Sequence, residues 1–320
     1  MRSKPVLWLP RKVSDATVAR ARENYEVILN EADTPGSADE IIAMSSQADA
    51  MMPCHSEHFS AQVVGKLDSR LKIVANHSVG VDHCDLDALR GRGIVVTNTP
   101  DVLSDATAEL AMLLMLGAAR HAVGGDRLVR TGAWDSWSPA FMVGKQLTGA
   151  RLGIVGMGRV GLAFAAKARG FGMDIHYYNR RRVSPEQEQA ATYHETVESL
   201  IEQADFLSLH CPATSETQNL MNAERFSLFP DGAVLVNTAR GALIDEDALL
   251  NAIKSGKLAA AGLDCFKVEP GGNPVFAAYE NIFMLPHIGS ATTRTRDAMG
   301  FRALDNLDAF FSGERPKDFL

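Results

Sequence analysis

Three segments in the second half of the chain carry side chains that could perform acid–base chemistry beside a bound anion. Arg240 directly follows one apolar run, Glu269 lies shortly after the next, and His287 follows the last. A guanidinium stays charged and can bind a carboxylate or polarise a carbonyl, an imidazole can donate and remove a proton, and a carboxylate can hold that imidazole in its charged form. Taken singly, a surface ion pair, a loop charge and a core histidine would explain them. Their common place after successive apolar runs favours a shared catalytic role.

Residues 152–182 would position a ligand next to these side chains. A short apolar run is followed by Gly156, Gly158 and Gly161 in the spacing G-x-G-x-x-G, then by a stretch rich in Ala and Leu and a second apolar run. This order of strand, glycine turn, helix and strand is typical of dinucleotide-binding units, in which the turn and the helix N-terminus hold the pyrophosphate. An ordinary glycine-rich turn is the alternative, and the flanking context argues against it.

The residues after the second run indicate which dinucleotide fits. NAD sites usually have Asp or Glu about 20 residues after the glycine turn, where it binds the ribose 2′-hydroxyl. Here Asn179 occupies that place, and Arg180, Arg181 and Arg182 follow it. A carboxylate would repel a 2′-phosphate and guanidinium groups would bind it, so we expect NADP(H), with NAD(H) less favoured. A solvated basic loop is the alternative.

Length and composition limit the classes of protein to which the chain can belong. Its 320 residues are enough for two domains, and contents of 46% hydrophobic and 22% charged residues are typical of a globular protein. The net charge of -7 argues against nucleic-acid binding. The four cysteines form no C-x-x-C pair, which is typical of reduced thiols in a cytoplasmic protein. We expect neither a signal peptide nor a membrane span.

Short apolar runs alternate with helical stretches, which predicts an α/β fold with two Rossmann-like doubly wound parallel sheets and the active site in the cleft between them. Residues 1–100 lack a phosphate-binding glycine signature, so we expect a flavodoxin-like substrate-binding domain there. Residues 101–292 would form the dinucleotide-binding domain, and an apolar stripe predicts that the helix in residues 293–320 returns to the first domain. The expected strands lie at residues 6–9, 25–29, 48–52, 71–75 and 94–97, then at 152–155, 175–178, 206–209, 233–236, 259–263 and 282–285.

Two loops leave alternatives open. Residues 76–82 follow an apolar run of the first domain, and the N–H groups of Val79 and Gly80 could bind an anion, although a plain turn would also explain them. Residues 123–149 form an arm whose second half has no clear periodicity and carries large apolar side chains such as Trp137. Such an arm is a candidate dimer contact, and a loop folded onto its own core is equally consistent with the sequence.

Together the motifs resemble the D-isomer-specific 2-hydroxyacid dehydrogenase family along essentially the whole chain. The matching pieces are SVGVDHCD, GMGRVG, HCPAT, NTARGALIDEDAL, AGLDCFKVEP and PHIGSAT. Within the family, SVGVDH, W-x-x-W-x-P and NRRR are most similar to the NADP-dependent glyoxylate/hydroxypyruvate reductases. The resemblance implies that Arg240, Glu269 and His287 are catalytic. The substrate contacts that it implies are Val79, Gly80, Arg240, His287 and, from a partner subunit, Trp137.

The resemblance also implies cofactor contacts and a homodimer built through the dinucleotide domain. It places Asp264 on the nicotinamide carboxamide. Asn179 departs from the acidic residue that is usual in the family, which puts NAD use in doubt, and Cys265 stands where Val is usual, next to Asp264, where we expect packing. The cofactor contacts expected from motif and resemblance together are Thr107, Gly156, Gly158, Arg159, Val160, Gly161, Asn179, Arg180, Arg181, Cys211, Pro212, Thr217, Thr238, Ala239, Asp264, His287 and Gly289.

We therefore expect NADPH-dependent reduction of a small 2-oxoacid, glyoxylate or hydroxypyruvate, with His287 as the acid/base and no nucleic-acid or membrane partner. A dehydrogenase of another D-2-hydroxyacid, and a non-catalytic dinucleotide-sensing regulator on the same fold, are the alternatives. The histidines and cysteines of PCHSEH and DHC lack zinc-finger spacing, so we expect no metal.

Overall fold

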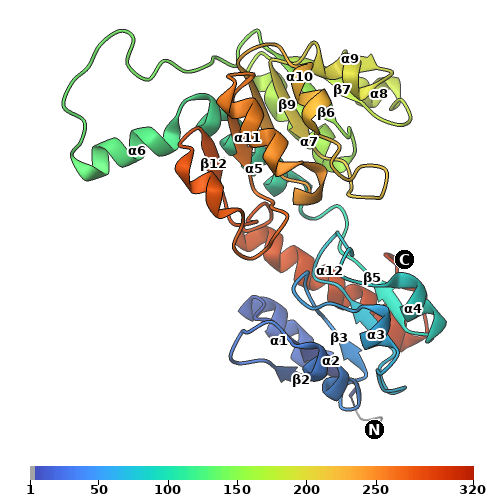
Figure 1. Ribbon diagram of the computed structural model, residues 1–320. Helices are drawn as coiled ribbons and strands as arrows, with labels where there is room; N and C mark the ends of the chain where they lie inside the picture. The colour runs from blue at the N-terminus through green and yellow to red at the C-terminus, as the bar shows by residue number, and fades with distance from the viewer. Residues whose placement is uncertain (1–3) are drawn as a thin grey trace. The chain divides into compact units, whose positions relative to one another are not determined.

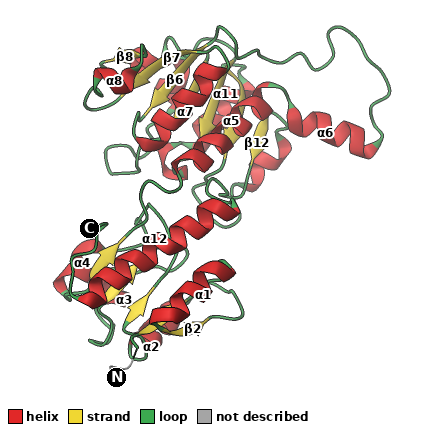
Figure 2. Cartoon of the chain, turned by 180° about the vertical axis from the view of Figure 1, so that it is seen from behind, coloured by secondary structure: helices red, strands yellow, loops and turns green. Residues whose placement is uncertain are grey.

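Two parallel sheets organise the chain, which the computed structural model describes from residue 4 to residue 320. The chain up to Leu103 and Ala291–Leu320 form one unit, and Ser104–Ser290 form the other. Each unit has helices on both faces of its sheet (Figures 1 and 2). The predicted α/β class with two parallel sheets is confirmed.

The first unit has the strand order β2-β1-β3-β4-β5, which is the flavodoxin-like order. All five strands lie within the apolar runs that predicted them. The helices α2, α3 and α4 contribute to a core on one face of the sheet, and α1 and α12 contribute to a core on the other. The elements are β1 (Val6–Leu9), α1 (Asp15–Asn24), β2 (Glu26–Leu29), α2 (Ala38–Ser45), β3 (Ala50–Met51), α3 (Ala61–Val64), β4 (Ile73–Ala75), α4 (Leu86–Gly91), β5 (Val95–Thr97) and α12 (Thr293–Ser312).

The last helix, α12, belongs to the first unit. Its buried Leu304 and Leu307 share a core with Leu7 and Leu9 of β1. The side chain of Thr292 accepts a hydrogen bond from the backbone at the helix start. The chain therefore returns to the first sheet after completing the second.

The second unit has seven parallel strands in the order β12-β11-β10-β9-β6-β7-β8, whereas the sequence pattern predicted six. The missed strand is β8, which has three residues, pairs only with β7 and is partly exposed, so its sequence carries no apolar run. The strands are β6 (Arg151–Val155), β7 (Asp174–Tyr178), β8 (Thr192–His194), β9 (Phe206–Leu209), β10 (Ala233–Asn237), β11 (Leu258–Leu263) and β12 (Ile282–Met284).

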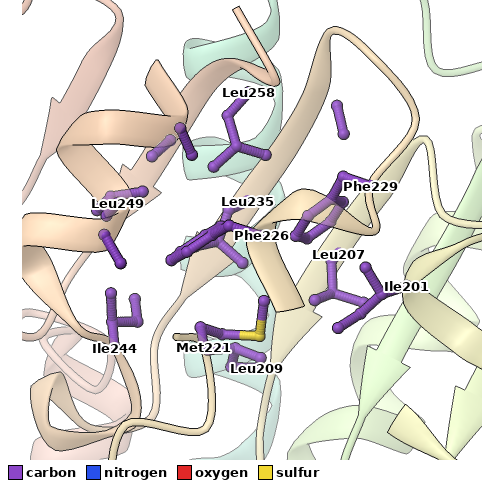
Figure 3. Close-up of a cluster of buried hydrophobic side chains, with 14 of the residues drawn as sticks. Ile201, Leu207, Leu209, Met221, Phe226, Phe229, Leu235, Ile244, Leu249 and Leu258 are labelled. Carbon is purple, nitrogen blue, oxygen red and sulfur yellow. The ribbon is translucent and has the colours of Figure 1, made fainter. Parts of the chain in front are cut away.

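Apolar cores cover both faces of this second sheet. The helices α5 and α7 contribute to one core, and α9, α10 and α11 contribute to the other. In the second core, Phe226 and Phe229 lie among aliphatic side chains of the strands, including Leu207 and Leu235 (Figure 3). The helices are α5 (Ser104–Ala119), α6 (Ala122–Thr131), α7 (Arg159–Gly170), α8 (Pro185–Glu188), α9 (Val197–Ile201), α10 (Ala223–Ser227) and α11 (Glu246–Lys254), and two short 3-10 turns span Gly241–Leu243 and Pro274–Ala278.

The arm predicted at residues 123–149 projects from the rest of the second unit (Figures 1 and 2). It consists of α6 and a long loop, and His121, with φ of 55°, separates α6 from α5. Within residues 4–320, no single helix is long and apolar enough to cross a bilayer; α5 and α6 pass that test only as a pair bent by 67°.

Candidate active site

The strand order of the second unit creates the place where a ligand would bind. From β6 the chain runs outward through β7 and β8, then returns to the other side of β6 and runs outward from β9 to β12. In an open parallel sheet, ligands bind beyond the carboxyl ends of the strands at such a reversal, here between β6 and β9. The predicted residues of this unit follow these strand ends, Arg159 and Val160 open α7, and Thr107 lies in the first turn of α5.

The glycine turn after β6 has the backbone geometry that a pyrophosphate requires. Gly156 has a φ of 101°, and a Cβ there would come within 2.6 Å of the Cys211 nitrogen. A Cβ on Gly161 would collide with the Gly156 carbonyl oxygen, so α7 begins close against the turn. Gly158 is the N-cap of α7 without a side-chain hydrogen bond, and open space lies beside its Cα. The first N–H groups of α7 can therefore donate hydrogen bonds to phosphate oxygens.

The end of β7 carries positive charge and no carboxylate at the position usual for NAD. The Asn179 Oδ1 accepts a hydrogen bond from the Met157 N–H at 2.7 Å, so this side chain is tied to the glycine turn. Arg180 and Arg181 are exposed. Arg182 instead pairs with a carboxylate on α8. All three arginines are exposed, and Arg182 differs from the other two in its close pairing with a buried carboxylate.

A histidine and a carboxylate meet at the same edge of the sheet. The His287 Nδ1 lies 2.5 Å from the Glu269 Oε2, and the other carboxylate oxygen accepts the Phe266 N–H at 2.7 Å. A carboxylate only accepts, so Nδ1 carries the hydrogen of this bond. The side chains of His287 and Glu269 are 31% and 21% exposed, so a small molecule can reach the pair.

Arg240 is held by a residue that the sequence reasoning did not single out. The buried Asn237 accepts the Ala239 N–H at 3.0 Å and donates to the Arg240 carbonyl at 2.8 Å, which shapes the turn after β10. A Cβ on Gly241 would overlap the backbone of Phe266, so this turn packs directly against the loop that carries Glu269. The only signal for Asn237 was its place in the motif NTARG.

Asp264 connects the end of β11 to the histidine loop. Its carboxylate is 1% exposed and accepts the N–H groups of Ile288 and Gly289, each at 2.8 Å. Burial raises the pKa of Asp264 to about 6, although the two amide hydrogen bonds act in the opposite direction. A Cβ on Gly289 would lie within 3.4 Å of both Asp264 and Thr107, so these residues are neighbours. The aspartate thereby fixes the backbone next to His287.

The loop after β9 supplies the remaining predicted positions. Thr217 Oγ1 donates to the Pro212 carbonyl at 2.8 Å and closes this loop. Burial raises the pKa of the Cys211 thiol to about 11, so it stays protonated at neutral pH. His210, which the sequence reasoning missed, lies between Ser208 and the buried Thr238. Burial lowers its pKa to about 3, which leaves it neutral.

In the first unit, carbonyl groups of the loop after β4 accept hydrogen bonds from side chains of the same unit. Asn98 Nδ2 donates to the Val79 carbonyl at 2.8 Å, and Ser78 Oγ donates to the Gly80 carbonyl at 2.7 Å. Among residues 4–320, the N–H groups of Val79 and Gly80 have no hydrogen-bond acceptor. The loop is therefore able to bind an anion through its backbone. In the same unit, His83 and Cys84 both hydrogen-bond to the side-chain oxygen of Asn76.

The remaining predicted residue, Trp137, lies on the arm and is 73% exposed. Val129 and Val143, also on the arm, are 63% and 70% exposed. Of the two alternatives left open by the sequence, the structure therefore favours an exposed arm over a loop packed on its own core. A large apolar side chain at such exposure is typical of a surface that another chain covers.

Known proteins resemble this chain over nearly its full length. A family model described as D-isomer specific 2-hydroxyacid dehydrogenase, NAD binding domain, matches residues 112–289. Glycerate dehydrogenase of Hyphomicrobium methylovorum is 40% identical over 313 residues, which cover 97% of each protein. Glyoxylate reductase of Pyrococcus furiosus is 39% identical, with coverage of 98% of this chain and 94% of that protein. The structure of an NADPH-dependent glyoxylate/hydroxypyruvate reductase of Sinorhizobium meliloti, in complex with NADP and malonate, matches with a TM-score of 0.87 and 32% identity over 99% of this chain and 97% of the other. This chain belongs to the D-isomer-specific 2-hydroxyacid dehydrogenase family.

Proposed function

We propose that this chain reduces a small 2-oxoacid, preferably glyoxylate or hydroxypyruvate, to the 2-hydroxyacid with NADPH. The observation that carries the proposal is the pairing of His287 Nδ1 with Glu269 Oε2 at the sheet edge that also bears the glycine turn. A proton donor next to a dinucleotide turn is what hydride transfer to a carbonyl requires from a protein. The names of the relatives, glycerate dehydrogenase and glyoxylate reductase, support this reaction class.

The proposed roles follow from the charge and geometry of each side chain. When bound, the nicotinamide supplies the hydride for the carbonyl carbon. Arg240 binds the substrate carboxylate or polarises the adjacent carbonyl, and His287 donates the proton from Nε2 to the carbonyl oxygen. Glu269 retains the hydrogen bond from Nδ1, so a fixed negative charge faces the imidazolium before the transfer. In the first unit, the N–H groups of Val79 and Gly80 are our candidates for further donors to a carboxylate.

The end of β7 supports NADP(H) over NAD(H). A 2′-phosphate would meet Asn179 in place of a carboxylate, together with two exposed guanidinium groups. The ion pair between Arg180 and Glu216 is 3.7 Å long and its side chains are 77% and 73% exposed, so it is weak and can yield to a phosphate. Among residues 4–320, the guanidinium of Arg181 has no hydrogen-bond or ion-pair partner. The Sinorhizobium meliloti relative is an NADPH-dependent reductase whose structure contains NADP.

A steady-state panel tests substrate and cofactor together. We would measure kcat/KM for glyoxylate, hydroxypyruvate, pyruvate and phosphohydroxypyruvate, each with NADPH and with NADH. We expect the highest values for glyoxylate or hydroxypyruvate with NADPH. A preference for NADH would contradict the cofactor proposal, and turnover of bulkier 2-oxoacids alone would replace the substrate. NADPH binding without turnover of any 2-oxoacid would favour a dinucleotide-sensing regulator.

We also propose that the protein is a homodimer joined through the arm at residues 123–149. The exposed Val129, Trp137 and Val143 would leave a lone chain with apolar side chains in water, which association removes. Light scattering at micromolar concentration should therefore give the mass of two chains. Replacing Trp137 with Ser should weaken the dimer, whereas a monomer already in the wild type would contradict the proposal.

A further inference from the structure

A carboxylate on α8 holds the loop that carries the three arginines. Glu188 is 8% exposed, and its Oε1 accepts the Tyr177 hydroxyl at 2.5 Å and the Arg182 Nε at 2.6 Å. Its Oε2 accepts the Arg182 Nη2 at 3.0 Å. The Tyr177 oxygen also accepts the Val183 N–H at 3.3 Å. One carboxylate thus joins the strand before the loop, the loop itself and the helix after it.

The groups of this network keep fixed protonation states at neutral pH. Burial and the hydrogen bond to Glu188 raise the pKa of Tyr177 to about 12, so its hydroxyl stays a donor. Hydrogen bonds from Arg182 and Tyr177 lower the pKa of Glu188, so it stays an anion. The bidentate geometry is the strong form of an arginine–carboxylate pair. The charge of Arg182 is therefore matched within the protein.

The loop is also fixed at its other end. The Tyr193 hydroxyl donates to the Asn179 carbonyl at 3.3 Å, and the Arg182 guanidinium lies 5.6 Å from the centre of the Tyr193 ring. Asn179 and Arg182 flank Arg180 and Arg181 in the sequence. Both flanking residues are therefore tethered, while the two residues between them are exposed.

We propose that Arg182 and Glu188 are positioning residues that set selectivity for the 2′-phosphate of NADPH, and that neither contacts the phosphate. Glu188 fixes the course of the loop, and Arg182 cancels the negative charge that would otherwise repel a phosphate bound by Arg180 and Arg181. This inference rests on the proposed use of NADPH. The alternative is that Arg182 itself binds the phosphate beside Arg180 and Arg181.

A double-mutant cycle separates the two interpretations. The variants are Arg182→Ala, Glu188→Gln and the double variant, each assayed for KM and kcat with NADPH and with NADH. The control is Arg90→Ala, which removes an exposed arginine paired with Asp87 at 2.9 Å in the first unit. Thermal melting would verify that each variant folds, and Arg182→Gln replaces the alanine variant if that one does not.

If Arg182 acts by cancelling the charge of Glu188, Arg182→Ala should raise the KM for NADPH by about tenfold and change the KM for NADH by less than about twofold, because an unpaired carboxylate repels only the extra phosphate. Adding Glu188→Gln removes the unpaired charge, and its amide oxygen can still accept the Tyr177 hydroxyl and hold the loop. Most of the lost affinity should then return, with kcat unchanged throughout. If Arg182 binds the phosphate itself, Glu188→Gln alone should tighten NADPH binding and the double variant should remain as weak as Arg182→Ala, which would overturn the inference. A wild-type protein that prefers NADH would instead overturn the cofactor proposal, whatever the variants do.

Discussion

Replacing Glu269 with Gln tests our proposal that a negative charge beside His287 prepares the imidazole to donate a proton. The two oxygens of Glu269 have different partners: one accepts the Phe266 N–H at 2.7 Å and the other accepts His287 Nδ1 at 2.5 Å. A backbone N–H can only donate, so the oxygen of Gln must stay on Phe266 and its NH₂ group must face the imidazole. The variant therefore removes the negative charge and places a donor where the charged imidazole requires an acceptor.

The expected effect is large because the pair is partly shielded from water. The two side chains are only 31% and 21% exposed, so water screens the charge of Glu269 incompletely. Reduction needs the charged imidazole, so removing the carboxylate that faces it should lower kcat/KM for reduction. Oxidation should fall at every pH by about 10²–10⁴-fold, because the neutral ring now carries its hydrogen on Nε2 and cannot accept another there.

The assay is kcat/KM for NADPH consumption, with the reverse reaction followed in parallel. Glu246→Gln is the matched control, because this carboxylate holds the same loop through the Lys267 N–H at 3.1 Å and the Asn273 side chain at 2.9 Å. This control weakens the hydrogen bonds that hold the loop but leaves the negative charge of Glu269 beside the imidazole. A rate of oxidation that is unchanged in Glu269→Gln, or that falls equally in both variants, would refute the reasoning.

Two further predictions concern the glycine turn and stability at acid pH. Gly161→Ala should destabilise the second unit by about 1–3 kcal/mol in thermal melting, because its Cβ collides with the turn. At Gly158 a Cβ faces open space, so Gly158→Ala should keep the stability of the protein and raise the KM for the dinucleotide. An equal loss of stability in both variants would contradict this explanation. Burial lowers the pKa of His77 from 6.5 to about 4, so the stability that neutral His77 allows is complete above pH 6.5 and is lost as pH falls toward 4. At pH 5 this loss is about 2 kcal/mol. His77→Gln keeps a donor for the Arg296 carbonyl. The free energy of unfolding of the first unit in urea should therefore fall by about 2 kcal/mol less between pH 7 and pH 5 in this variant than in the wild type. The control is His58→Gln at an exposed position, and equal losses in the wild type and His77→Gln would exclude His77 as the cause.

Local patterns in the sequence were sufficient for most of the fold. Apolar runs predicted the strands because a strand buried in a parallel sheet is apolar on both faces. The glycine spacing predicted the turn, because only residues without a Cβ fit at Gly156 and Gly161. The order of Arg240, Glu269 and His287 after successive strands placed them at one edge, because parallel strands share their carboxyl ends. The edge strand β8 escaped prediction, because a short, half-exposed strand has no apolar run.

The sequence by itself determined which residue types lie at the carboxyl ends of the strands, because the strands along the chain and the glycine spacing can be recognised from local patterns of residues. It could not determine how those residues divide their hydrogen bonds. Three consecutive arginines look alike in the sequence, and only the folded chain brings the buried Glu188 to Arg182 and not to Arg180 or Arg181. The same holds for Asn237, whose amide shapes the Arg240 turn. Partner choice depends on distances of a few tenths of an ångström between groups on different elements, and those distances arise only when the elements pack.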